Sequence, residues 1–135
     1  MTVDNPLGLA AHHITGLVVD LDRAIAWYQR ILGCTLLELG SHQDGALRYA
    51  ELKLGDFGIG LIQLQGQARL PVSPGPPIAP SWLHIVFAVR DPDATFQLLK
   101  ARGAEVFTRT PQPSQPLSAF LARDSEGNEL EIVVA

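Results

Sequence analysis

The sequence contains one segment twice, and this near-duplication constrains the fold more than any other feature. The segment from His13 to Ala24 returns in similar form from His84 to Thr95. Each copy starts with His-Ile, runs through an apolar stretch and reaches an aspartate seven residues after the histidine. Each copy then closes on a glycine, Gly33 or Gly103, so the offset is 71 residues between the histidines and 70 between the glycines. Self-similarity at a fixed offset indicates a repeated structural unit, and we predict two copies of one module.

The first copy has the pattern of a strand, a helix and three further strands. A β-rich stretch over 12–19 precedes Asp20, whose carboxylate can accept hydrogen bonds from the free amides of a first helical turn. Apolar residues then recur at the spacing of one helical face up to Gly33, a residue type that often ends a helix in the left-handed conformation. The three predicted strands that follow cover 34–40, 47–54 and 58–64.

The second copy repeats this order. A strand over 82–90 leads into Asp91-Pro92, which is a helix cap followed by proline at the first helical position, and the helix ends at Gly103. We predict a single domain over 1–135, with the first module at about 10–66 and the second at about 81–135. Between them lies a stiff connector over 67–80, because five of the ten residues from 71 to 80 are proline. The later strands are predicted over 105–110, 117–123 and 130–134.

Composition narrows the class of protein. The chain has 135 residues and is 47% hydrophobic, which is enough for one core, and it has no apolar run of the ~20 residues that a membrane helix needs. Its net charge is −4 and it has no basic run, so we expect neither nucleic acid nor a membrane as a partner. Cys34 is the single cysteine, and the N-terminus lacks the basic start of a secretory signal. These features favour a reduced, cytoplasmic setting, in which we expect Cys34 to be buried and inert.

The doubled unit also carries recognisable motifs. His-Ile-x5-Asp stands at the head of each copy, and Asp-x-x-Gly-Asn-x-x-Glu covers 124–131. A β-α-β-β-β unit that is doubled in this way resembles the vicinal oxygen chelate superfamily, which includes glyoxalase I, extradiol dioxygenases and bleomycin-binding proteins. The resemblance covers nearly the whole chain. It implies an α+β fold in which two tandem βαβββ modules form a curved, cup-shaped mixed β-sheet.

The resemblance also implies a set of metal ligands on the first and last strands of each module. Carried over residue by residue, these positions are His13, Gly60, His84 and Glu131. His13 is preferred to His12 because only His13 keeps the seven-residue spacing to an aspartate that the second copy has. Gly60 has no side chain that could bind a metal, so His13, His84 and Glu131 remain as the predicted ligands.

Two imidazoles and one carboxylate leave open coordination positions, which suits Fe²⁺ or Mn²⁺, with Zn²⁺ or Ni²⁺ as further possibilities. Either Gln63 or water could compensate for Gly60. A bound cation would also offset the cost of placing Glu131 on a strand with apolar neighbours. The alternative is that Glu131 faces water at the end of a short strand.

Other residues are candidates for the cup or for catalysis. Single polar or aromatic residues on strands more often have structural roles, and we hold that alternative open for each candidate. Phe120, which lies 71 residues after Tyr49, is expected to pack in the core if it does not line the cup. The candidates for lining the substrate cup are Thr15, Tyr49, Gln63, Trp82 and Phe120, and those for catalysis are Tyr49, His42 and Glu51.

We therefore expect a small metalloenzyme that binds a substrate through two vicinal oxygens. Because three ligands remain, the resemblance favours dioxygenase-like chemistry, with a glyoxalase-type lyase or isomerase as the alternative. A metal-free protein that binds a drug of the bleomycin type is the alternative from another class. Members of this superfamily are commonly homodimers whose modules can pair across chains. His13 could therefore share a metal with His84 and Glu131 of the partner subunit.

Overall fold

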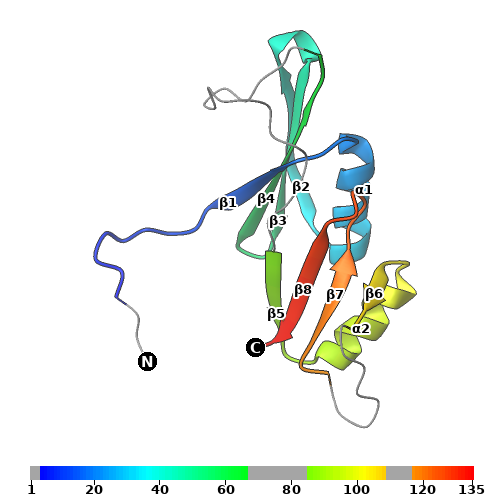
Figure 1. Ribbon diagram of the computed structural model, residues 1–135. Helices are drawn as coiled ribbons and strands as arrows, with labels where there is room; N and C mark the ends of the chain where they lie inside the picture. Colours follow the sequence, from blue (N-terminus) through cyan, green and yellow to red (C-terminus); the bar gives the residue numbers. More distant parts are fainter. Residues whose placement is uncertain (1–3, 67–84, 109–116) are drawn as a thin grey trace.

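The computed structural model describes residues 4–66, 85–108 and 117–135, which form two four-stranded sheets with one α-helix each (Figure 1). The first half contains β1 (His13–Leu17), α1 (Leu21–Leu32), β2 (Thr35–His42), a short 3₁₀ turn (Gln43–Gly45), β3 (Leu47–Leu54) and β4 (Phe57–Leu64). The second half contains β5 (Ile85–Val89), α2 (Pro92–Ala101), β6 (Glu105–Phe107), β7 (Ala119–Arg123) and β8 (Glu129–Val134). The predicted connector over 67–80, His84 and Trp82 lie outside the described residues.

Both halves have the same topology. The strand orders are β1-β4-β3-β2 and β5-β8-β7-β6, and in each sheet the first strand pairs with the last strand in parallel. Ile14 pairs with Ile59, and Ile85 pairs with Leu130, so the 71-residue offset is kept on both strands of the pair. The α+β fold of two βαβββ units is therefore confirmed.

The helix caps follow the sequence signals. Asp20 Oδ1 accepts a hydrogen bond from the backbone N of Arg23 at 3.1 Å, and Asp91 Oδ1 accepts one from the N of Ala94 at 3.1 Å. Gly33 ends α1 with a φ of 76°, where a side chain would be strained. Local signals thus set where each helix begins, and α1 ends where its glycine predicts.

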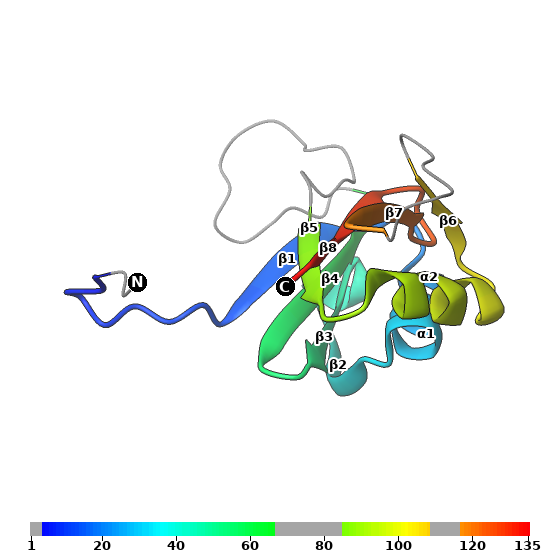
Figure 2. The same cartoon turned by 90° about the horizontal axis from the view of Figure 1, so that it is seen from below.

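One apolar core joins the two halves. Helix α1 buries Leu21, Tyr28 and Ile31 completely, and they belong to the same cluster as Leu130 and Ile132 of β8. The rings of Phe57 on β4 and Phe87 on β5 also meet edge to face, with their centroids 6.0 Å apart. Both helices lie together beside the sheets (Figure 2). Each sheet therefore has a core face, which is turned toward this cluster, and an outer face, which is turned away from it.

A buried carboxylate ties the second half to the first. Asp124, in the turn between β7 and β8, is only 7% exposed. Its Oδ2 accepts a hydrogen bond from the phenol of Tyr28 on α1 at 2.7 Å, and its Oδ1 accepts from the backbone N atoms of Glu126 and Asn128, both at 2.9 Å. The sequence suggested only apolar packing for Tyr28, so this polar contact is an addition from the structure.

The same turn also contacts the start of α1. Glu126 accepts hydrogen bonds from the backbone N of Val19 at 2.6 Å and of Asp20 at 3.3 Å. At the other end of the helix, Arg102 donates from Nη1 to the carbonyl oxygen of Ile31 at 2.8 Å. Both ends of α1 are therefore held by residues of the second half. Among the described residues, no helix combines the length and the apolar character needed to cross a membrane.

We predict that Tyr28→Phe will lower the free energy of unfolding by about 1–3 kcal/mol, because the buried carboxylate of Asp124 would lose a hydrogen-bond donor. Urea denaturation followed by circular dichroism would measure the change. Tyr49→Phe is the matched control, since the phenol of Tyr49 bonds an exposed carboxylate, and it should leave stability nearly unchanged. Equal losses in the two variants would contradict a special role for Asp124.

Candidate functional site

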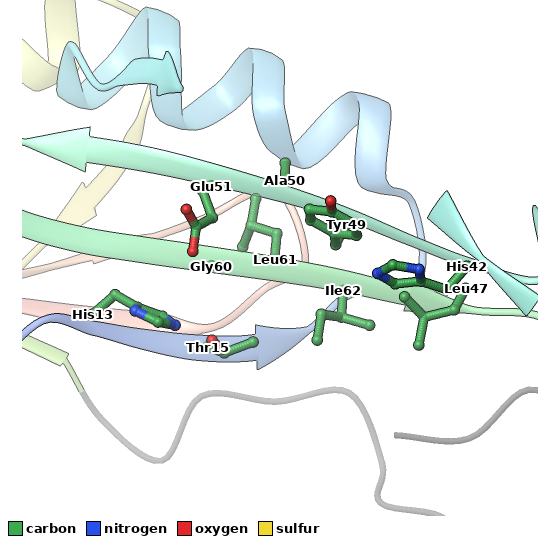
Figure 3. Close-up of a pocket in the computed structure, with 10 residues that line it drawn as sticks. All are labelled: His13, Thr15, His42, Leu47, Tyr49, Ala50, Glu51, Gly60, Leu61 and Ile62. Carbon is green, nitrogen blue, oxygen red and sulfur yellow. The ribbon is translucent and has the colours of Figure 1, made fainter. Parts of the chain in front are cut away.

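The outer face of the first sheet carries an open pocket of about 220 Å³ (Figure 3). Strands β1, β3 and β4 supply most of its lining, and the end of β2 supplies the rest. The pocket is mainly apolar at one end and carries an imidazole and a carboxylate at the other. Its lining residues are His13, Thr15, His42, Leu47, Tyr49, Ala50, Glu51, Gly60, Leu61 and Ile62.

Strand register explains why these side chains meet. Gly60 of β4 pairs with Thr15 of β1 on one side and with Glu51 of β3 on the other. Directly paired residues point to the same face of a sheet, so the three form one row across the outer face. His13 pairs with Gly58, one row further along the sheet. The sequence predicted His13, Thr15 and Glu51 as site residues, and the structure brings all three to this face.

Two glycines let the side chains of β1 lie against β4. A Cβ at Gly60 would stand 2.7 Å from Oγ1 of Thr15, and a Cβ at Gly58 would stand 2.5 Å from Cβ of His13. Neither position can hold a side chain unless its neighbour on β1 moves. The predicted fourth-ligand position at Gly60 is therefore filled by the hydroxyl of Thr15. Gly58 was missed from the sequence, although its spacing of two from Gly60 places it on the same face.

His13 is oriented by its neighbour in the chain. The Nδ1 atoms of His12 and His13 are 2.7 Å apart, so one donates a proton to the other, and their rings meet edge to face. This contact leaves Nε2 of His13 as the nitrogen that would bind a metal, and a hydrogen bond at the other ring nitrogen is the usual way of orienting such a ligand. A second hollow of about 180 Å³ lies alongside, and it shares His13 and Glu51 with the first.

The aromatic end of the pocket is formed by Tyr49 and His42. Their rings stack with centroids 5.3 Å apart, and the phenol of Tyr49 donates a hydrogen bond to Oε1 of Glu38 at 2.9 Å. This bond is the main reason that the pKa of Tyr49 is raised above its ordinary value, with burial and the charges of Glu38 and Glu51 adding to it. Tyr49 therefore stays protonated at neutral pH and can donate a proton. Leu47, which shares the face by strand alternation, was also missed from the sequence.

Glu131 lies on the outer face of the other sheet. It pairs with Val86 of β5 and Leu121 of β7, while its chain neighbours Leu130 and Ile132 point into the core. His13 and Glu131 are thus on outer faces that point away from one shared core. Within the described ranges, no group of three or more histidine, cysteine, aspartate or glutamate side chains could hold a metal. One chain therefore does not bring these two predicted ligands together.

Gln63 does not line the pocket, contrary to the prediction. It lies on the core face of β4, is 9% exposed, and its Oε1 accepts a hydrogen bond from the backbone N of Leu21 at 2.7 Å. The odd-numbered residues of β4, including Ile59 and Leu61, face the core, so Gln63 points away from the outer face that carries Gly60. It therefore stabilises the start of α1 and cannot compensate for Gly60.

Phe120 is likewise a core residue and does not line the outer pocket. It is 2% exposed and meets Phe96 of α2 edge to face at 5.2 Å. Leu52 pairs with Ile59, whereas Ala122 pairs with Leu130, so β7 follows β3 by 70 residues and β8 follows β4 by 71. A slip of one residue moves a side chain to the opposite face. The repeat partner of Tyr49 is consequently Ala119.

Cys34 is not a candidate nucleophile. It is 6% exposed in the core, and burial raises the pKa of its thiol to about 11. The thiolate is the reactive form, and it is scarce at neutral pH. This agrees with the buried, inert role expected from the sequence.

Comparisons with known proteins come from sequence and from structure. A family model described as the Glyoxalase/Bleomycin resistance protein/Dioxygenase superfamily matches residues 10–132. A search of curated proteins finds no match. Among solved structures, the chain is similar to a glyoxylase/bleomycin resistance protein/dioxygenase domain from Frankia sp. EAN1pec, with a TM-score of 0.67 and 24% identity over 94% of this chain and 98% of that chain.

Two further structures share the fold at lower identity. TnmS3, an antibiotic binding protein from Streptomyces sp. CB03234, has a TM-score of 0.65 and 20% identity over 99% of this chain and 98% of its own. A variant of the fosfomycin resistance protein FosX from Listeria monocytogenes, complexed with Mn(II) and 1S,2S-dihydroxypropylphosphonic acid, has a TM-score of 0.65 and 16% identity over 93% of this chain and 92% of its own. Similarity at this level supports a shared architecture.

We predict that Gly60→Ala will destabilise the protein by about 1–3 kcal/mol, because the new Cβ would crowd Oγ1 of Thr15. Thr15→Ala in the same chain should recover most of this loss, since it removes the atom in the way. Urea denaturation of both single variants and the double variant would measure the coupling. Additive losses would contradict the contact.

Proposed function

Since the chain belongs to the glyoxalase/bleomycin resistance protein/dioxygenase superfamily, we propose that it is a metal-dependent enzyme whose site forms between two copies of the chain. The ligands would be His13 of one copy with His84 and Glu131 of the partner subunit. The observation that carries this proposal is the position of His13 and Glu131 on outer faces that point away from one core. Only a second copy can bring such faces together.

The chemistry of the donor groups fits a divalent cation. Nε2 of His13 is available on an exposed strand, and Gly58 and Gly60 leave the outer face free of side chains beside it. Imidazole and carboxylate ligands suit Fe²⁺ or Mn²⁺, with Zn²⁺ or Ni²⁺ as alternatives. The similarity to FosX, which was crystallised with Mn(II), is consistent with this choice.

The outer face of the second sheet also has the character of a surface that another chain covers. Val86 is 51% exposed although it stands on a strand, directly beside Glu131. On the first sheet, Leu47 and Ile62 give the pocket an apolar wall. Apolar contact between these two faces would stabilise a homodimer and would exclude water from the ligands.

The substrate is proposed to be a small molecule with two vicinal oxygens. The cation would act on them as a Lewis acid when bound, with dioxygenase-like chemistry as the first expectation and lyase or isomerase chemistry as the second. Thr15 would hold the substrate through its hydroxyl group, and Tyr49 would donate a proton from its phenol. His42, which is exposed beside Tyr49, would exchange protons with solvent.

A second function has its own support. The pocket is lined largely by apolar atoms around the stacked rings of Tyr49 and His42, and one protein of similar fold, TnmS3, is an antibiotic binding protein. The chain would then be a metal-free protein that binds a small molecule. Metal content distinguishes the two proposals.

The first test is a metal census. Protein purified under low oxygen, without a histidine tag or chelator, should contain about one iron or manganese per chain by mass spectrometry. His13→Ala and Glu131→Ala should each lose it, because each removes a ligand. His42→Ala, which removes a histidine of the same pocket, should retain it. Protein that holds no metal even after reconstitution would favour the binding-protein alternative.

The second test asks whether two chains share the site. A purified heterodimer of one His13→Ala chain and one Glu131→Ala chain should bind about half the metal of the wild-type dimer, because one of the two shared sites keeps all of its ligands. Each mutant homodimer should bind none. If the heterodimer also binds none, each site lies within a single chain and the sharing is wrong.

A further inference from the structure

We propose that Glu51 supplies the carboxylate that Gly60 cannot, so that the metal site has a fourth protein ligand, delivered from β3 in place of β4. This inference rests on the function proposed above. It concerns a residue outside the set of strands from which the resemblance draws its ligands. Three observations on the outer face of the first sheet support it.

The first observation is position. Glu51 pairs directly with Gly60, and its side chain lies on the same face. In Figure 3 its carboxylate extends over β4 at Gly60 and points toward the imidazole of His13. His13 and Glu51 are both part of the lining of two adjacent hollows, of about 220 and 180 Å³. The carboxylate thus occupies the place where a side chain at position 60 would project.

The second observation is space. A Cβ at Gly60 would meet Oγ1 of Thr15 at 2.7 Å, so the hydroxyl of Thr15 and a side chain at 60 exclude one another. The glycine leaves the surface of β4 low between β1 and β3. A side chain from β3 can reach across this low surface toward β1. Thr15 and Gly60 together therefore make room for Glu51.

The third observation is the state of the carboxylates. Several others in the described parts of the chain have donors: Glu38 accepts from Tyr49, Glu105 from Arg123, and Glu126 from two backbone amides. Glu51 is half-buried, and within the described ranges its carboxylate makes no hydrogen bond or ion pair. A partly buried charge is costly unless it is paired or binds a metal. A cation beside His13 would provide the missing partner.

The fourth ligand changes the expected chemistry. Each module would contribute one imidazole and one carboxylate, His13 with Glu51 and, from the partner subunit, His84 with Glu131. A six-coordinate cation with four protein ligands keeps two positions, which is the number that two vicinal oxygens fill. This would favour the lyase or isomerase alternative over dioxygenase-like chemistry, which also needs a position for oxygen.

Titration of the full-length protein with Mn²⁺ alone, followed by the electron paramagnetic resonance signal of free Mn²⁺, tests the inference without any assay of activity. Glu51→Gln should weaken Mn²⁺ binding about tenfold or more, because it removes a charged donor and keeps the shape of the side chain. Glu38→Gln is the matched control, since Glu38 pairs with Glu51 on the same face but does not line either hollow, and it should change affinity less than about twofold.

The outcomes separate this inference from the function on which it rests. If wild-type protein binds Mn²⁺, and Glu51→Gln binds it as tightly while His13→Ala does not, the fourth ligand is wrong and the shared three-ligand site stands. If wild-type protein binds no Mn²⁺, the metalloenzyme itself is wrong. Circular dichroism and urea denaturation of Glu51→Gln verify that the variant folds, and Glu51→Asp, which keeps the charge, should recover part of the affinity.

Discussion

Burial of both sheets against one apolar core is the constraint on which the rest of the molecule depends. Helix α1 buries its apolar face completely, and the same cluster continues into β8. Each sheet therefore spends one face on stability and has one left for chemistry. The phenol of Tyr28 and the carboxylate of Asp124 add a polar contact between the halves, which stabilises one arrangement of the modules. The separation of His13 from Glu131 follows from this packing.

Much of the fold could be predicted from local signals. The repeat offset, the caps at Asp20 and Asp91 and the αL glycine at position 33 all reflect short-range physics, and the structure agrees with them. Phe120 was misplaced because the offset is 70 residues between β3 and β7 and 71 between β4 and β8, and one residue is enough to exchange the faces of a strand.

The rest depends on contacts that local patterns do not encode. Nothing in the chain around Gln63 indicates that its amide will accept a hydrogen bond from Leu21, which is 42 residues away. The pairing of core faces across the two modules is similarly a property of the whole core. The sequence therefore identified His13, Thr15 and Glu51 as residues of interest, whereas their meeting on one face required the strand register.

The contact between Gly60 and Thr15 also bears on how such a site can change over evolutionary time. A mutation that restores a larger residue at position 60 meets the hydroxyl group at once, and a mutation of Thr15 alone brings no new ligand. The two changes must arrive together, or pass through a less stable intermediate sequence. The present arrangement is therefore isolated from its neighbours in sequence space by a steric barrier, and selection at Gly60 acts on a pair of positions rather than on one.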